Sequence, residues 1–147
     1  MNPNVAKDIL AALPLNRHLG VEVLEVAAER GVCQLPEREE LKNHVGTQHA
    51  GALFTVGEAA SGACVLGALG ERLATVTPLA KSATIAYKKP ARGPITATAR
   101  VTEPVEAVLE RLGREGKALL DVAVSLEDGA GLLVAEMTVA WHLRTNT

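Results

Sequence analysis

The stretch NHVGTQHAGALFTVGEAASGACVLGALG, residues 43–70, decides the fold of this chain. Most of it is small and apolar, yet Glu58 stands in its middle, between Thr55 and Ser61. A membrane span needs roughly 20 apolar residues, but the central carboxylate, the many Gly and Ala residues and the lack of an adjoining basic flank argue against one. The stretch therefore predicts a central helix over about residues 50–69, covered by the rest of the domain.

Composition limits the kinds of partner that the protein can have. The 147 residues suffice for a single domain over residues 1–147 with one core. A net charge of −2, a pI of about 6.1 and 2% aromatic residues give neither the basic surface nor the stacking platforms of a nucleic-acid-binding protein. Cys33 and Cys64 form no CxxC motif and are expected to be reduced core thiols. The N-terminus lacks the basic-then-apolar pattern of an export signal, so we expect a cytoplasmic protein without a membrane partner.

The flanking sequence predicts a sheet around the central helix. A helix is expected over about residues 3–13, with Asn2 as its cap and Pro14 as its stop. Alternating apolar residues predict strands on both sides of the central helix. These strands are expected near residues 19–23, 32–35, 80–87, 95–101, 120–126 and 133–141, with a short helix over residues 104–112. The fold class is therefore α+β, with a curved antiparallel sheet wrapped around a long central helix.

Glu58 is the first candidate for chemistry. A carboxylate is seldom buried without a partner, so Glu58 either pairs with a cation or hydrogen-bond donors, or lines a cleft. In an apolar cleft, weak solvation suits a carboxylate to general-base or nucleophilic work. Gly57 and Gly62 lie beside it and lower helix propensity by roughly 1 kcal/mol each. They indicate close approach by a strand, a second subunit or a ligand.

The start of the central helix is the second candidate. Asn43, His44, Gln48 and His49 precede it. Free backbone N–H groups at a helix start stabilise a carbonyl oxygen that becomes an oxyanion. Glu58 lies about two turns further, near 10 Å along the axis. One chain therefore cannot serve one small carbonyl with both groups, but two copies of the helix running antiparallel across a dimer would bring each start near the other's carboxylate.

These residues carry a family resemblance. Asn43, His49-Ala50-Gly51 six residues later and Glu58 nine residues after the His reproduce the signature spacings of the hot-dog fold acyl-CoA thioesterases. The chain resembles the PaaI-type branch of that superfamily over about residues 15–143, and YKKPARG (residues 87–93) is similar to its strand ending in a Pro…Gly connection. Ala50 replaces the first Gly of the signature, and Glu58 replaces its usual Asp. The additional helix expected over residues 104–112 is similar to that of a sister group of the same fold.

The resemblance implies a hot-dog fold and hydrolysis of an acyl-CoA thioester by a homo-oligomer, a dimer at least, with a tetramer expected as the final state. It implies no metal and no prosthetic group, with coenzyme A entering only as part of the substrate. The implied catalytic residues are Glu58, Asn43, His49 and Gly51, and the implied ligand-binding residues are Ala50, Lys88, Lys89 and Arg92.

In that scheme the N–H groups of Ala50 and Gly51 polarise the thioester carbonyl. Glu58 of the second copy activates water or attacks the carbonyl directly, and Asn43 and His49 orient the reacting groups. The basic connection meets the phosphates of coenzyme A.

Two other functions fit the same residues. In a non-catalytic acyl-CoA-binding hot-dog protein, Glu58 would only anchor an interface, Asn43 would form a turn and His49 would pack at the helix start. Hydroxyacyl thioester dehydratases and hydratases use a His and a Glu fourteen residues apart, the spacing of His44 and Glu58. The Pro-rich stretch that those enzymes carry between the two residues is absent here.

Overall fold

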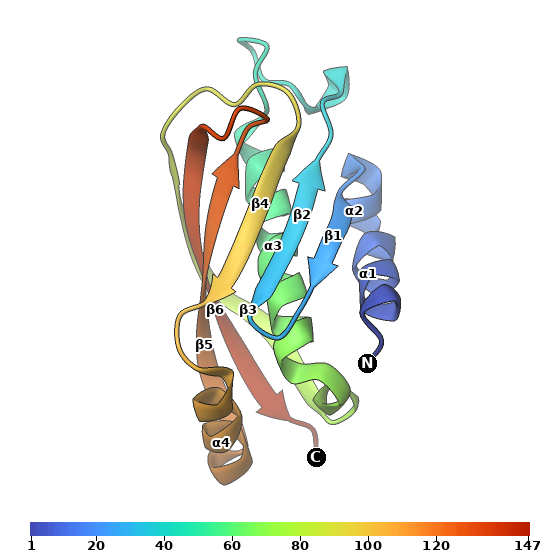
Figure 1. Ribbon diagram of the computed structural model, residues 1–147, viewed down its shortest axis with the longest axis vertical. Helices are drawn as coiled ribbons and strands as arrows, with labels where there is room; N and C mark the ends of the chain where they lie inside the picture. The colour runs from blue at the N-terminus through green and yellow to red at the C-terminus, as the bar shows by residue number, and fades with distance from the viewer.

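The apolar stretch forms α3 (Ala50–Leu69), a 20-residue helix around which the rest of the chain is arranged (Figure 1). The computed structural model describes all residues from Met1 to Thr147. By length and composition alone the segment Ala50–Ala74 could cross a membrane, with a mean hydropathy of 1.5, but 67% of its apolar window is buried inside the domain. Such burial is typical of the core helix of a globular protein.

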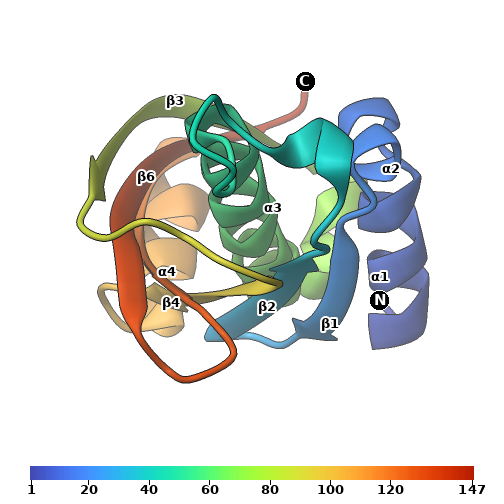
Figure 2. The same cartoon turned by 90° about the horizontal axis from the view of Figure 1, so that it is seen from above.

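Six antiparallel strands form one sheet in the order β1-β2-β4-β5-β6-β3. Seen from above, this sheet curves around α3 (Figure 2). The predicted architecture, an α+β domain with a curved antiparallel sheet wrapped around a long central helix, is therefore confirmed. The strands are β1 (Glu22–Val26), β2 (Arg30–Leu35), β3 (Val76–Tyr87), β4 (Ile95–Val101), β5 (Lys117–Glu127) and β6 (Leu133–Thr145).

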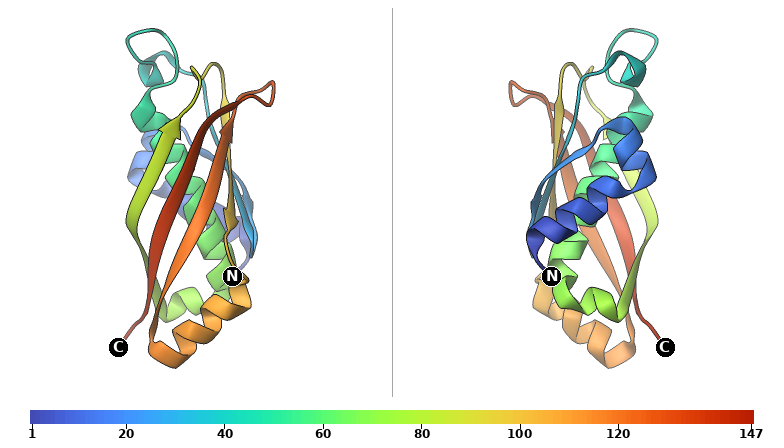
Figure 3. Two further views of the ribbon diagram at one scale, coloured as in Figure 1. Left: turned by 90° about the vertical axis from the view of Figure 1, so that its left-hand side faces the viewer. Right: turned by 90° about the vertical axis from the view of Figure 1, so that its right-hand side faces the viewer.

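The remaining helices cover the sides of this arrangement. Helices α1 (Pro3–Ala12) and α2 (Pro14–Leu19) lie beside β1, on the other side of α3 from β6 (Figure 2). Helix α4 (Val105–Glu115) lies across the lower end of the molecule (Figure 3). Two short 3-10 helices, Glu39–Leu41 and Gly70–Ala74, precede and follow α3.

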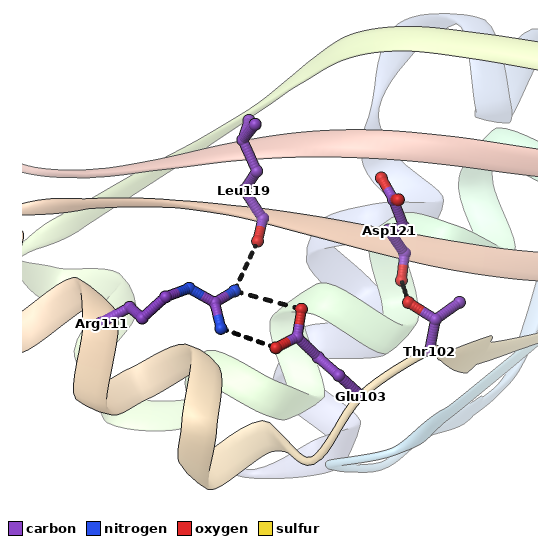
Figure 4. A network of polar contacts seen from close by, with 5 residues as sticks. All are labelled: Thr102, Glu103, Arg111, Leu119 and Asp121. Carbon is purple, nitrogen blue, oxygen red and sulfur yellow. Dashed lines mark hydrogen bonds and ion pairs between the residues drawn. The ribbon is translucent and has the colours of Figure 1, made fainter.

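Arg111 joins α4 to the connection that precedes it and to β5. The Arg111 guanidinium donates to both carboxylate oxygens of Glu103, at 2.7 and 3.1 Å, and to the carbonyl oxygen of Leu119 at 3.1 Å (Figure 4). Hydrogen bonding to Arg111 lowers the pKa of the Glu103 carboxyl. This network belongs to the lower end of the domain, far from the start of α3 (Figure 1).

The predicted stop of the first helix before Pro14 is confirmed, since α1 ends at Ala12. The strand boundaries that follow were wrong, because Pro14 begins a second helix, α2, at whose first position a residue without an N–H fits. Leu19 consequently belongs to α2, and β1 begins only at Glu22. Strand β3 starts at Val76 and includes Pro78, which an edge strand tolerates because its outer side needs no ladder hydrogen bond.

Two glycines of α3 let the helix lie close to a side chain of β6 and to the backbone of the turn between β1 and β2. A Cβ at Gly67 would collide with the carbonyl oxygen of Ala27, and one at Gly57 would lie 2.6 Å from the Met137 sulfur. The close approach predicted from Gly57 is therefore confirmed. At Gly62 the nearest side-chain atoms would be at 3.8 Å, an ordinary contact, so no strand of the chain comes as close there.

The close contact at Gly67 predicts opposite effects of two identical substitutions. Gly67→Ala should lower the free energy of unfolding by about 2 kcal/mol, since the new methyl group must displace the backbone at Ala27. Gly113→Ala in α4, where a Cβ meets nothing within 4 Å, should raise it by about 0.5–1 kcal/mol. Urea unfolding of both variants measures the difference, and equal stability of the two would contradict the close approach of α3.

Candidate active site

The start of α3, the loop of residues 43–48 and the end of β3 meet at the upper end of the molecule (Figure 3). A cavity of about 330 Å³ opens there. Of the predicted site residues it is lined by Asn43, Ala50, Lys88 and Lys89. His49, Gly51, Glu58 and Arg92 do not line it.

Asn43 shapes the loop that leads into α3. Its Oδ1 accepts hydrogen bonds from the N–H groups of Val45 at 3.1 Å and Thr47 at 3.0 Å. Its Nδ2 donates to the Thr47 hydroxyl at 2.8 Å and to the Gln48 carbonyl at 3.4 Å. This use of a side-chain amide is a turn-forming one. Asn43 therefore acts on the site through the shape of the loop.

Gln48 ties the same loop to the basic connection. Its Nε2 donates to the carbonyl oxygens of Pro36 at 3.0 Å and Gly93 at 2.9 Å, and its backbone N–H donates to Ala91 at 2.8 Å. Two carbonyl partners fix which end of the amide is the donor. The side chain is 4% exposed, and its Oε1 has no hydrogen-bond partner.

His49 caps α3 and thereby pairs with the Gly51 N–H, one of the two N–H groups that were predicted to stabilise an oxyanion. Its Nδ1 accepts a hydrogen bond of 2.8 Å from the Gly51 N–H. The Ala50 N–H has no partner within the chain. Because Nδ1 is an acceptor, the proton of the neutral ring is on Nε2. The donors available at the start of α3 are therefore the Ala50 N–H and the His49 Nε2–H, while the Gly51 N–H is engaged.

Tyr87 joins the end of β3 to the first turn of α3. Its hydroxyl donates to the Ala50 carbonyl oxygen at 3.0 Å, and its ring lines the cavity. Partial burial raises the pKa of this phenol. The sequence prediction missed it, although the single tyrosine of the chain directly precedes the basic connection.

Glu58 is half-buried and has no partner in its own chain. No cation lies within 4.0 Å of its carboxylate, and no donor forms a hydrogen bond with it. Burial raises the pKa of this carboxyl above its ordinary value of 4.5. The neighbouring hydroxyls do not reach it, because Thr55 bonds back to the Gly51 carbonyl and Ser61 to the Glu58 carbonyl. A desolvated, unpaired carboxylate is a stronger base than a solvated one.

The other polar residues play smaller parts in one chain. Lys88 lies 3.5 Å from the Glu136 carboxylate. Lys89 forms no ion pair within the chain. His44 and Arg92 are exposed and lie outside the cavity. No group of three or more His, Cys, Asp or Glu side chains is placed to hold a metal ion.

The two cysteines are buried, unpaired thiols. Burial raises the pKa of Cys33 to about 12, with a further contribution from the charge of Glu58. Burial likewise raises the pKa of Cys64 to about 11. Neither thiol is a thiolate at neutral pH, so neither is suited to act as a nucleophile.

A curved antiparallel sheet wrapped on a long central helix is the hot-dog fold, which confirms the predicted resemblance to the thioesterase superfamily of that fold, while the PaaI-type branch stays a prediction. Within it, the chain belongs to the family described as Domain of unknown function (DUF4442), whose model matches residues 5–143. A search of curated proteins found no match.

Solved structures share this fold over nearly the whole chain. PA5026 from Pseudomonas aeruginosa, described as a protein of unknown function and probable thioesterase, is 27% identical, with a TM-score of 0.87 over 97% of this chain and 95% of its own. The thioesterase HI1161 from Haemophilus influenzae is 14% identical, with a TM-score of 0.79 over 99% and 92% of the two chains. A thioesterase family protein from Silicibacter pomeroyi is 20% identical, with a TM-score of 0.78 over 96% of each chain.

The raised pKa of Glu58 predicts how stability depends on pH. Between the ordinary carboxyl pKa and the raised one, the folded chain holds a proton that the unfolded chain releases, so stability falls as pH rises through that window. Glu58→Gln removes this penalty. We expect the variant to be more stable than wild type at pH 7, with the advantage vanishing below about pH 4. Thermal unfolding across this range measures it, and a less stable variant at pH 7 would instead mark Glu58 as an interface anchor.

Proposed function

We propose that the protein is an acyl-CoA thioesterase whose active site is completed by a second copy of the chain. One observation carries this proposal: the cavity at the start of α3 contains an unpaired N–H donor and cations but not Glu58, the unpaired carboxylate of the same helix. The likeness to PA5026, described as a probable thioesterase, supports the reaction class.

The chemistry follows from these groups. The thioester carbonyl oxygen would accept a hydrogen bond from the Ala50 N–H, where the positive end of the helix dipole stabilises the charge that develops on it. The His49 Nε2–H is the second available donor, and the Gly51 N–H becomes a donor once the His49 ring turns away. Glu58 from the second copy would take a proton from water as it attacks, or attack the carbonyl itself. The carbon–sulfur bond then breaks, and the coenzyme A thiolate leaves and takes up the proton that Glu58 or water holds. Where Glu58 is the nucleophile, a water molecule then hydrolyses the mixed anhydride and frees the carboxylic acid. This route needs no metal or prosthetic group.

Strand β3 offers the surface for the second copy. It is an edge strand of 12 residues, and most of its side chains are exposed. The opposite edge, β1, has five residues with a register shift between Val23 and Glu25, and α1 packs beside it. Long open edges invite pairing, whereas short and bulged edges resist it. Pairing along β3 would place the two α3 helices side by side and antiparallel, and two such dimers would form the expected tetramer.

The basic connection suits coenzyme A. Lys88 and Lys89 line the cavity next to the Ala50 donor, and Arg92 follows on the exposed side of the same connection. Cations at the rim of a carbonyl site fit the phosphates at the far end of a coenzyme A thioester.

The proposal predicts the effect of removing the Glu58 carboxylate. Glu58→Gln should keep fold and ligand binding but lower thioester hydrolysis several hundred-fold, which corresponds to a barrier higher by about 4 kcal/mol at 1.36 kcal/mol per decade. Thiol release from a panel of coenzyme A thioesters measures it. A wild-type protein that binds these thioesters but hydrolyses none would favour the acyl-CoA-binding alternative.

Subunit complementation tests whether the site is shared. Glu58→Gln and His49→Ala chains, co-expressed with different tags and isolated by both, contain one site in which both residues are intact. We expect such mixed dimers to regain about half of wild-type activity, although each parent is nearly inactive. Without any regain, or with a stable monomer by light scattering at micromolar concentration, the shared site is excluded.

Histidine variants separate a thioesterase from a dehydratase. His44 is exposed outside the cavity, so His44→Ala should retain at least about a tenth of wild-type hydrolysis. His49→Ala and Asn43→Ala remove the helix cap and the loop turn, and each should lose roughly 2–3 kcal/mol of transition-state stabilisation. His49→Asn is the matched control, since it can still cap α3. Loss of activity in His44→Ala, together with hydration of an enoyl thioester by the wild type, would support the dehydratase alternative.

A further inference from the structure

The turn of α3 that carries Glu58 is fastened to β6 by two hydrogen bonds in series. The Trp141 indole N–H donates to the Ser61 hydroxyl oxygen at 3.0 Å, and the Ser61 hydroxyl donates to the backbone carbonyl oxygen of Glu58 at 2.7 Å. Ser61 is 0% exposed and Trp141 is 7% exposed. Water therefore does not compete for either bond.

A second contact holds the other side of the same turn. Gly57 precedes Glu58 and faces Met137, which lies on the same inward face of β6 as Trp141. The space that a Cβ would need at Gly57 is taken by the Met137 sulfur. The helix is thus held against β6 both before and after Glu58.

This seating sets the direction of the carboxylate. Each helical residue turns by about 100°, so Gly57 and Ser61 point to β6 within about 40° of each other. Glu58 lies about 100° beyond Gly57, on the flank of α3 that also carries the exposed Gly51 and Phe54. A rotation of α3 by one residue would turn the carboxylate into the sheet.

We propose that Ser61 and Trp141 are positioning residues for Glu58, and that their hydrogen bonds hold the turn so that the carboxylate faces the substrate. This inference rests on the proposed thioesterase function. The stability of the fold does not require the Ser61–Trp141 hydrogen bond. Replacing both partners of a buried hydrogen bond by apolar groups changes the free energy of unfolding little, whereas removing one partner leaves the other unsatisfied and lowers it.

A double-mutant cycle separates positioning from stability. The variants are Ser61→Ala, Trp141→Phe and the double variant, each in the full chain, with Ser61→Thr as the conservative rescue. We expect Ser61→Ala and the double variant to lower kcat about ten-fold with KM within two-fold of wild type, and Ser61→Thr to restore it. The double variant should unfold at a higher urea concentration than Ser61→Ala, because no indole N–H is left unpaired.

A matched control comes from the lower end of the domain. The double variant Glu103→Gln with Arg111→Met breaks the network of Figure 4 and should lower the unfolding midpoint without changing kcat. If Ser61→Ala behaves in the same way, with a lower unfolding midpoint and an unchanged kcat, Ser61 and Trp141 have a structural role only and the inference is overturned.

Nuclear magnetic resonance gives a readout that does not depend on activity. The chain has one tryptophan, so its indole N–H signal reports the bond to Ser61 without ambiguity. The Glu58 carboxyl signal, assigned by its loss in Glu58→Gln, should titrate at a lower pH in Ser61→Ala, as the loosened turn admits water. If the wild type hydrolyses no thioester, the proposed function fails, and the Glu58 titration alone then decides the positioning role: an unchanged midpoint refutes it.

Discussion

The close seating of α3 on the strands is the constraint on which the rest of the structure depends. Side chains on facing elements normally keep a helix and a sheet apart, and interiors are packed without voids. Here Gly57 and Gly67 remove side chains from the helix at two contact points. The volume of the core comes instead mainly from the strands, whose fully buried side chains include Leu35, Ile95, Leu120, Leu126 and Leu143.

The polar groups around the start of α3 are of two kinds: some form hydrogen bonds that shape the cavity, and others have no partner in the chain. Asn43, Gln48 and Tyr87 use their hydrogen bonds on the loop, the basic connection and the first turn of α3. They build the cavity. The Ala50 N–H and the Glu58 carboxylate have no partner in the chain, and they are the groups that the proposed mechanism uses for the reaction. The residues that a site needs for its shape are thus distinct from those that it needs for reaction.

The sequence was sufficient to predict the core helix, because a long apolar stretch with one central carboxylate fits no exposed or membrane position. It was not sufficient to predict which polar groups at the start of α3 form hydrogen bonds with each other. The spacing places His49 and Gly51 at a helix start, but the same residue types occur there whether they cap the helix or form an oxyanion site. Only the 2.8 Å hydrogen bond from the Gly51 N–H to His49 Nδ1 shows that this N–H is already paired. Helix α2 was missed for a similar reason, since Pro14 follows the end of α1 and also begins α2, and one residue type can do both.

The separation of donor and carboxylate along α3 is the reason why the proposed mechanism needs two copies of the chain. A carboxylate close to N–H donors or a cation loses basicity, and Glu58 lies about two turns away from the donors at the helix start. Burial raises the pKa of its carboxyl, and no donor or cation in the chain offsets that effect. In the proposed antiparallel pair, the Ala50 donor of one chain faces the carboxylate of the other across the width of a substrate carbonyl. The donor then acts on the carbonyl oxygen and not on Glu58, so the base stays strong while the oxyanion is stabilised.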